Sequence, residues 1–227
     1  MARAPQRYIA IIADMVGSRS VARSRRSALQ EKFADLMDSL NRDYKKMIAS
    51  RFVITLGDEF QGLLNAASPI PDLIWRLEQE FSRVEFRVGI GLGRLDTPIQ
   101  KYAINIDGPA LHIARAAVED AKRNKVLGGT FRGFGDLDDV LNGIARLLWF
   151  QRSRWTVSQR TIANFIRRGM SQTQVAKRLR VTKQVVSKQV SASGCYDYMA
   201  AEKAWRMILE KQVNPLLGLK HVPSQSH

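Results

Sequence analysis

With 227 residues and 45% hydrophobic content, the chain is long enough for one large or two small domains, and a largely disordered protein is excluded. The chain has a single cysteine, Cys195, which excludes an internal disulfide and a cysteine-based metal centre. The lack of a disulfide is typical of proteins in a reducing compartment. We find no signal peptide and no apolar run close to the roughly 20 residues that cross a bilayer. We therefore expect a soluble protein of the cytoplasm, without a membrane partner.

The net charge of +15 is concentrated near the end of the chain. Residues 1–150 carry 22 Lys or Arg against 18 Asp or Glu, whereas residues 151–227 carry 14 against 3. From Gln151 to Tyr196 there are ten basic residues and no acidic one. A block this basic indicates a surface for a polyanion, although a basic face kept for solubility would have the same composition. We predict two domains, 1–150 and 151–227.

The first predicted strand is the apolar run Tyr8–Ala13, which is followed by Asp14. A nearly continuous apolar run is typical of a strand that is buried on both faces. Residues 51–65 are predicted to form a hairpin, because a Gly-Asp turn separates two apolar runs. Asp58 and Glu59 lie at or just past that turn. Carboxylates at the ends of two central strands can share Mg²⁺ or Mn²⁺ with a polyphosphate.

Two amphipathic helices are predicted next, one over 27–44 and one from about residue 68 to 81. The loop before the first helix is rich in arginine and serine and includes Ser18 and Arg19. Its cations could hold a nucleotide phosphate beside Asp14, but a solvated loop often has the same composition.

The segment 86–92 is predicted to be a strand although it contains two glycines, with a third just after it. Glycine weakens a strand, so its repetition indicates a close approach by another backbone or a ligand. A helix is predicted to begin at Pro109. It carries His112 and Arg115 on neighbouring positions, where each could be structural or part of a site.

The segment 122–139 is rich in glycine and charge, so we predict a mobile loop or hairpin there. A helix over 140–150 is predicted to lead into the basic block.

Four blocks of the first domain resemble the SatD family, whose members share their order: residues 13–18 (ADMVGS), 55–62 (TLGDEFQG), 87–93 (RVGIGLG) and 107–115 (DGPALHIAR). The motifs around Asp14 and Asp58 are also similar to the metal-binding motifs of class III nucleotidyl cyclases, and GDEF to GGDEF diguanylate cyclases. The resemblance implies an α+β fold, with a ferredoxin-like or palm βαββαβ core and helices on one face. On this basis we assign Asp14, Asp58 and Glu59 to a metal and Ser18, Arg19, His112 and Arg115 to a nucleotide.

The chain departs from the cyclase pattern where cyclases stabilise the transition state. Their Asn and Arg, four residues apart on one helix, correspond here to His112 and Ala116, with Arg115 one step out of register. The positions that select the purine hold Ile54 and Asn105. Because a missing oriented cation raises the barrier to phosphoryl chemistry, these residues favour a nucleotide sensor over a cyclase.

The basic domain resembles a DNA-binding helix-turn-helix, such as region 4 of sigma factors. Helices are predicted over Val157–Arg168 and Gln172–Leu179, and a third begins after Thr182, with Ala176 allowing close packing and Val181 sealing the turn. A purely structural three-helix bundle is the alternative. We predict that Lys183, Gln184, Ser187 and Lys188 reach base edges and that Arg167, Arg168, Arg178 and Arg180 contact phosphates.

A final amphipathic helix is predicted over 196–214, with a disordered tail after Gly218. Because a single helix-turn-helix usually holds double-stranded DNA weakly, we expect a homodimer.

Three functions fit these residues. The first is a DNA-binding transcriptional regulator whose first domain senses a metal–nucleotide ligand or has lost catalysis. The second is a metal-dependent nucleotidyl cyclase or nucleotidyltransferase with a DNA-binding tail. In the third, Asp14 and Asp58 are a structural remnant without a ligand.

Overall fold

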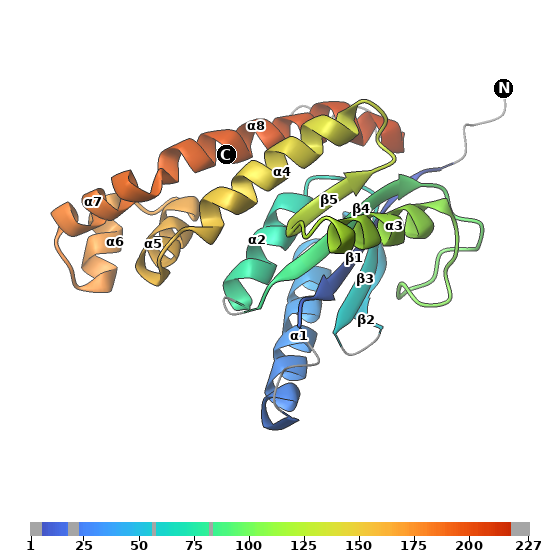
Figure 1. Ribbon diagram of the computed structural model, residues 1–227, viewed down its shortest axis with the longest axis horizontal. Helices are drawn as coiled ribbons and strands as arrows, with labels where there is room; N and C mark the ends of the chain where they lie inside the picture. The colour runs from blue at the N-terminus through green and yellow to red at the C-terminus, as the bar shows by residue number, and fades with distance from the viewer. Residues whose placement is uncertain (1–5, 18–22, 56–57, 82–83, 219–227) are drawn as a thin grey trace. The chain divides into compact units, whose positions relative to one another are not determined.

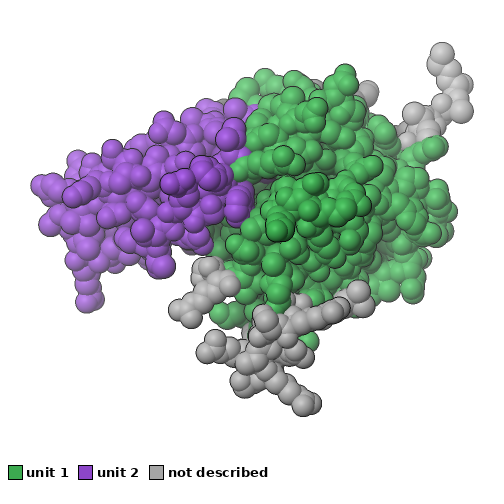
Figure 2. Space-filling view, viewed as in Figure 1, with its two compact units in different colours: residues 1–146, 206–227 green, residues 147–205 purple. Residues whose placement is uncertain are grey.

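A computed structural model describes residues 6–17, 23–55, 58–81 and 84–218 of the chain (Figure 1). Contacts divide the chain into two compact units, residues 1–146 with 206–227 and residues 147–205 (Figure 2). The division falls inside two helices, α4 (Leu137–Ser153) and α8 (Cys195–Ile208). The segment that begins at Arg206 therefore belongs to the first unit and not to the basic second unit.

The first unit is built on a five-stranded sheet with the order β2-β3-β1-β4-β5. β1 pairs antiparallel with β3 and β4, β2 pairs antiparallel with β3, and β5 pairs parallel with β4. With α1 and α2, the first four strands form the predicted ferredoxin-like βαββαβ core. The bounds are β1 (Tyr8–Met15), α1 (Arg23–Asp43), β2 (Ile48–Ile54), β3 (Glu59–Leu64), α2 (Ile70–Glu80), β4 (Phe86–Gly93) and β5 (Gly128–Arg132).

The two helices of the core, α1 and α2, lie on one face of the sheet, as predicted. The ring of Phe33 in α1 is 5.7 Å from that of Phe60 in β3 and 5.6 Å from that of Phe86 in β4. Phe81, at the C-terminal end of α2, joins the same cluster, 5.0 Å from Phe33. These edge-to-face and stacked rings fill the layer between helices and sheet.

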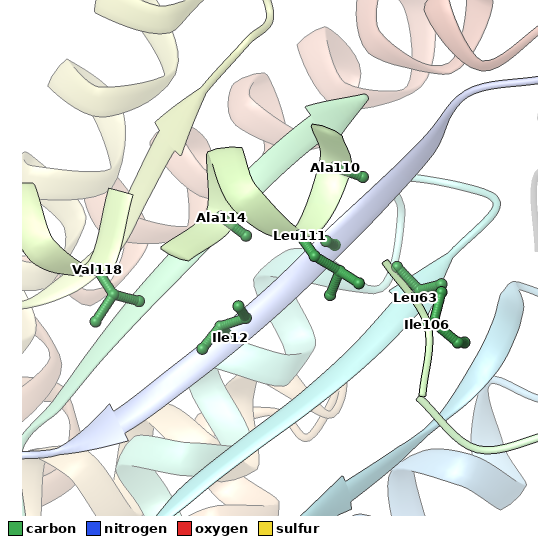
Figure 3. Close-up of a cluster of buried hydrophobic side chains, with 8 residues drawn as sticks. Ile12, Leu63, Ile106, Ala110, Leu111, Ala114 and Val118 are labelled. Carbon is green, nitrogen blue, oxygen red and sulfur yellow. The ribbon is translucent and has the colours of Figure 1, made fainter. Parts of the chain in front are cut away.

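The helix after the core, α3 (Pro109–Arg123), covers the opposite face of the sheet. There Ile12 of β1 packs with Ala114 and Val118 of α3 in a buried apolar cluster (Figure 3). A side chain on Gly91 would place its Cβ only 2.3 Å from the backbone nitrogen of Ala114. The glycines of β4 therefore allow the close approach of another backbone, that of α3. A backbone and a ligand were the two alternatives that the sequence indicated.

The expectation of a mobile loop or hairpin over 122–139 is wrong. This segment contains β5, in which Phe131 is buried and lies in register with Ile90 of β4. The side chain of Asn142 in α4 accepts from the backbone nitrogen of Phe131 at 2.8 Å and donates to its carbonyl at 2.9 Å. Burial and this two-point bond hold a segment that its glycine content alone suggested was irregular.

The second unit is helical and contains α5 (Val157–Arg167), α6 (Gln172–Leu179) and α7 (Lys183–Ser193). All three helices begin at side-chain caps, which are Thr156, Ser171 and Thr182. The caps at Thr156 and Ser171 are reciprocal capping boxes with a glutamine three residues later, which satisfies two free backbone donors at once. These local signals explain why the helix bounds follow the sequence prediction closely.

A tight connection joins α6 to α7. Arg180 adopts a left-handed conformation with φ of 55°, and the backbone nitrogen of Val181 donates to the carbonyl of Ala176 at 3.0 Å. This bond closes the end of α6 in a Schellman motif. The buried side of the α6–α7 pair is formed by Val175, Ala176, Val186 and Val190. The prediction that Val181 seals the turn is wrong, because this side chain is exposed.

The last predicted helix is interrupted. After α8 come a π-helical turn, Leu209–Val213, and a 3₁₀ turn, Asn214–Leu217. The side chain of Asn214 accepts from the backbone nitrogen of Ala67 at 2.8 Å, which ties this segment to the first unit. The predicted tail after Gly218 lies outside the described residues. None of the helices in the described ranges has the length and apolar character needed to span a membrane.

Candidate functional site

The predicted carboxylates meet at the end of β1. In the strand register Asp14 lies opposite Glu59 of β3 on one side and opposite Arg87 of β4 on the other. The backbone nitrogen of Met15 donates to the carbonyl of Asp58 at 3.1 Å, which extends the β1–β3 pairing to that residue. Antiparallel partners share a face of the sheet, so Asp14, Glu59 and Arg87 form a charged row on the face that α3 covers.

Glu59 is held by Arg115 of α3. The guanidinium makes two contacts with the carboxylate, of which Nη2 to Oε1 is 2.8 Å. The hydroxyl of Thr55 donates to the same Oε1 at 2.9 Å. The side chain of Glu59 is only 5% exposed, whereas that of Arg115 is 41% exposed. The buried carboxylate is therefore paired with a guanidinium that is in contact with solvent. The Glu59 carboxylate raises the pKa of Arg115, mainly through the hydrogen bond.

Asp14 is contacted by two cations. Arg87 Nη1 lies 3.5 Å from Asp14 Oδ2, and Lys122 Nζ, from the last turn of α3, lies 3.8 Å from the same oxygen. Burial nevertheless raises the pKa of Asp14 above its ordinary value, opposed first by Lys122 and reinforced by the negative charge of Asp58. The negative charge of Asp58 therefore disfavours the ionised form of Asp14.

The donors fit a metal only in part. Within the described ranges, no three or more His, Cys, Asp and Glu side chains are grouped so that they could hold a metal ion. The three-carboxylate set of Asp14, Asp58 and Glu59 is therefore not assembled, because Glu59 is directed to Arg115 and Thr55. Asp14 and Asp58 remain as two carboxylates, and Mg²⁺ is usually held by one or two carboxylates together with phosphate oxygens and water.

The predicted nucleotide residues are dispersed. His112 lies on the first turn of α3, with its Nε2 2.9 Å from Asp107 Oδ1. Since ten residues of helix separate it from Lys122, His112 is about 15 Å along the axis from the residue that reaches Asp14. Of the two residues assigned on this helix, only Arg115 is brought to the charged row. Ser18 and Arg19 lie outside the described residues.

Two cations that contact Asp14 were missed by sequence reasoning. Arg87 precedes the glycines of β4, and the even spacing of strand residues would place it on the glycine face. Lys122 is seven residues from Arg115, hence two turns along the same side of α3. Both positions follow from periodicity, but only the packing of β1, β4 and α3 shows that both side chains contact Asp14.

In the second unit, the residues predicted to read bases share one side of α7. Val186 and Val190 are buried against the unit. Lys183, Gln184, Ser187 and Lys188 are all exposed.

The arginines predicted at phosphates differ from one another. Arg168, Arg178 and Arg180 are exposed, and the guanidinium of Arg178 lies 5.1 Å from the ring centre of Phe165. Arg167 instead pairs with Glu202 of α8, through Nη2–Oε1 at 2.6 Å and Nε–Oε2 at 3.0 Å. Because these two side chains are 18% and 6% exposed, Arg167 is committed to the interior of the unit.

Fold and site together define an α+β protein in which a ferredoxin-like sheet carries a charged row at the ends of its central strands, followed by a basic helical unit. The SatD family profile matches residues 8–209. The chain belongs to the SatD family.

Among solved structures, the chain is similar to the dimeric guanylyl cyclase domain of the RhoGC fusion protein from the aquatic fungus Blastocladiella emersonii. The match has 13% identity and a TM-score of 0.41, and it covers 52% of this chain and 76% of that one. A second match is the catalytic core of a rhodopsin-guanylyl cyclase with converted specificity in complex with ATPαS, with 12% identity, a TM-score of 0.38 and coverage of 51% and 72%. No curated protein matches the chain.

Proposed function

We propose that this protein is a DNA-binding transcriptional regulator whose first unit binds a metal–nucleotide ligand without turning it over. The observation that carries the proposal is the exposed side of α7. It presents Lys183, Gln184, Ser187 and Lys188 from a stretch with ten basic residues and no acidic one. A helix held on its apolar side by a neighbouring helix, with polar residues outward, is the arrangement that enters a major groove.

The chemistry of these side chains suits base recognition. A glutamine can bond adenine at two points, and lysine can reach the guanine acceptors in the major groove. Arg168, Arg178 and Arg180 would neutralise phosphates and fix the register of the helix without reading sequence. We leave Arg167 out of this interface because of its pair with Glu202.

For the first unit we propose that Asp14 and Asp58 share Mg²⁺ or Mn²⁺ with the polyphosphate of a nucleotide. When bound, the metal would supply positive charge to the phosphates, while Arg87 and Lys122 balance the remaining carboxylate charge. The cation nearest to a cyclase transition-state position, Arg115, is bound to Glu59 by two contacts. An arginine engaged in this way is not available to meet developing phosphate charge, which favours binding over catalysis.

For the ligand to regulate DNA binding, it must favour one state of the chain over another. The test is a thermal-shift screen of nucleoside triphosphates with Mn²⁺ or Mg²⁺, followed by product analysis and by DNA titration in the same conditions. Stabilisation that Asp58→Ala abolishes, without product, supports a sensor. Product formation would establish the enzyme instead, and no shift with any nucleotide would leave Asp14 and Asp58 as a structural remnant.

A further inference from the structure

One apolar side chain of α7 is exposed among the residues that we propose to read bases. Val185 is 45% exposed, whereas the other valines of this helix, Val186 and Val190, are buried. Gln184, just before Val185, and Lys188, three positions after it, are also exposed. A single exposed valine is common on protein surfaces and does not by itself indicate a ligand. The first turn of α7, however, shows that helix stability does not favour a valine at this position.

That turn lacks an interaction that the two preceding helices make. In α5 and α6 the third helical residue is a glutamine, which completes a reciprocal capping box with the cap residue. In α7 the third residue is Val185, whose backbone nitrogen donates to the Thr182 hydroxyl at 3.3 Å. Valine has no side-chain acceptor for the return bond, and it also favours a helix less than glutamine does. Neither the cap nor the core of the unit therefore accounts for this residue.

The surroundings of Val185 are cationic. Lys183 and Lys188 lie two positions before it and three after it, and both are exposed. The stretch 151–196 that includes them has no acidic residue. An apolar group among cations suits a partner that offers negative charge and an apolar group together. Double-stranded DNA is such a partner, because its phosphates border a major groove in which thymine presents a methyl group.

We propose that Val185 contacts the C5-methyl group of a thymine in the major groove, so that the recognised DNA site contains thymine at that position. This inference rests on the proposed function and names a base that the proposed function leaves open. Gln184 directly precedes Val185, and a glutamine can bond adenine at two points. Because the thymine paired with adenine carries its methyl group in the same groove, the two side chains would read one A·T pair or two neighbouring pairs.

The stiffness of valine suits this contact. In a helix its branched side chain takes one strongly preferred χ1 rotamer, so the two methyl groups of Val185 are held in place before DNA binds. Little side-chain entropy is then lost when the base is contacted. The contact also favours DNA over RNA, because uracil lacks the C5-methyl group.

The test uses the full chain and the duplex that it enriches from a random pool of DNA. This duplex is prepared with deoxyuridine in place of thymidine, one position at a time, which removes one methyl group and keeps the base pairing. We expect one position at which the parent loses affinity about fourfold, the effect of one buried group of this size. Val185→Ala should bind the thymine and uracil forms of that duplex equally well.

Two variants separate the methyl contact from folding. Val157→Ala is the matched control, because Val157 is an 82% exposed valine in the first turn of α5 in the same unit. It should respond to uracil as the parent does. Val185→Gln should complete a capping box with Thr182 and raise the midpoint of urea unfolding, yet lose the response to the methyl group.

The outcomes distinguish this inference from the proposed function. A parent that enriches a motif but binds every uracil form as tightly as the thymine form would overturn the inference and leave the proposed function standing. A methyl response that Val185→Ala retains would assign the contact to another residue and overturn the inference as well. A parent that retains no duplex, or that shows no sequence preference, would overturn both.

Discussion

Arg115 and Glu59, 56 positions apart in the chain, form a two-point ion pair that joins α3 to the first residue of β3. The carboxylate is buried and the guanidinium is partly exposed, so the pair is asymmetric. Loss of the arginine leaves a buried anion that still accepts a hydrogen bond from the Thr55 hydroxyl at 2.9 Å, whereas loss of the glutamate leaves a cation that solvent can reach. This asymmetry gives the first prediction.

Arg115→Ala should lower the free energy of unfolding by about 3 kcal/mol, because the buried carboxylate of Glu59 loses the cation that compensates its charge. Glu59→Ala should cost less, on the order of 1–2 kcal/mol, since the arginine can turn to water. The double variant should cost less than the sum of the two. Urea unfolding of the three variants measures these values, and equal costs for the two single variants would contradict the asymmetry.

Asp14→Asn should alter the pH dependence of stability. Burial raises the pKa of Asp14, so the folded state binds its proton more tightly than the unfolded state does. Stability is then lost as pH rises from the unfolded value of 3.8 through the raised folded value. The variant should lack that loss and be as stable as the parent at neutral pH, or more stable by up to about 1 kcal/mol. Urea unfolding of the parent and the variant over a pH series measures this difference. A variant whose stability falls more steeply with rising pH than that of the parent would contradict the prediction.

The same substitution should abolish stabilisation by a nucleoside triphosphate with Mn²⁺. A protein that is no less stable but no longer responds to the ligand distinguishes a binding residue from a structural one. Arg76→Ala, at a partly exposed pair with Asp43 on the same unit, is a control and should keep the full ligand response. Equal responses in all three proteins would remove Asp14 from the site.

Two adjacent arginines should behave in opposite ways. Arg168→Ala should weaken binding to all duplexes and lower the slope of log affinity against log salt by about 1, because one phosphate contact is lost. Arg167→Ala should leave that slope unchanged but cost about 3 kcal/mol of stability, since Glu202 would be buried without its partner. A salt titration and a urea titration separate the two roles. A changed slope in Arg167→Ala alone would reverse their assignment.

Cys195 should react slowly in the folded protein. Its side chain is buried, and burial raises the pKa of the thiol from 9.0 to about 11. Because the thiolate is the reactive form, labelling by a disulfide reagent at pH 8 should be slower than in denaturant by on the order of a hundredfold or more. Rapid labelling of the native protein would show that the start of α8 opens readily.

Much of the fold follows from local sequence signals. The caps Thr156, Ser171 and Thr182 identify the starts of three helices, and the apolar run after Tyr8 identifies the central strand. β5 could not be recognised, because its glycines look like a loop until Phe131 is seen in register with Ile90. Strand identity there is set by partners distant in sequence.

The site was predictable only in outline. The motifs around Asp14 and Asp58 indicate the carboxylates that we propose to hold a metal, but they do not indicate that Glu59 is directed to Arg115. Nor does the sequence distinguish Arg167 from Arg168, because the partner of Arg167 is Glu202, 35 positions away. The role of these side chains therefore depends on partners that are distant in sequence and that only the tertiary structure shows.

The most direct test of the proposed function is selection of bound sequences from a random pool of duplex DNA with the full chain. If α7 reads bases, the parent should enrich a defined motif, and the variant combining Lys183→Ala and Gln184→Ala should still retain DNA but enrich none. A parent that retains no duplex, or that retains duplexes without any sequence preference, would contradict it.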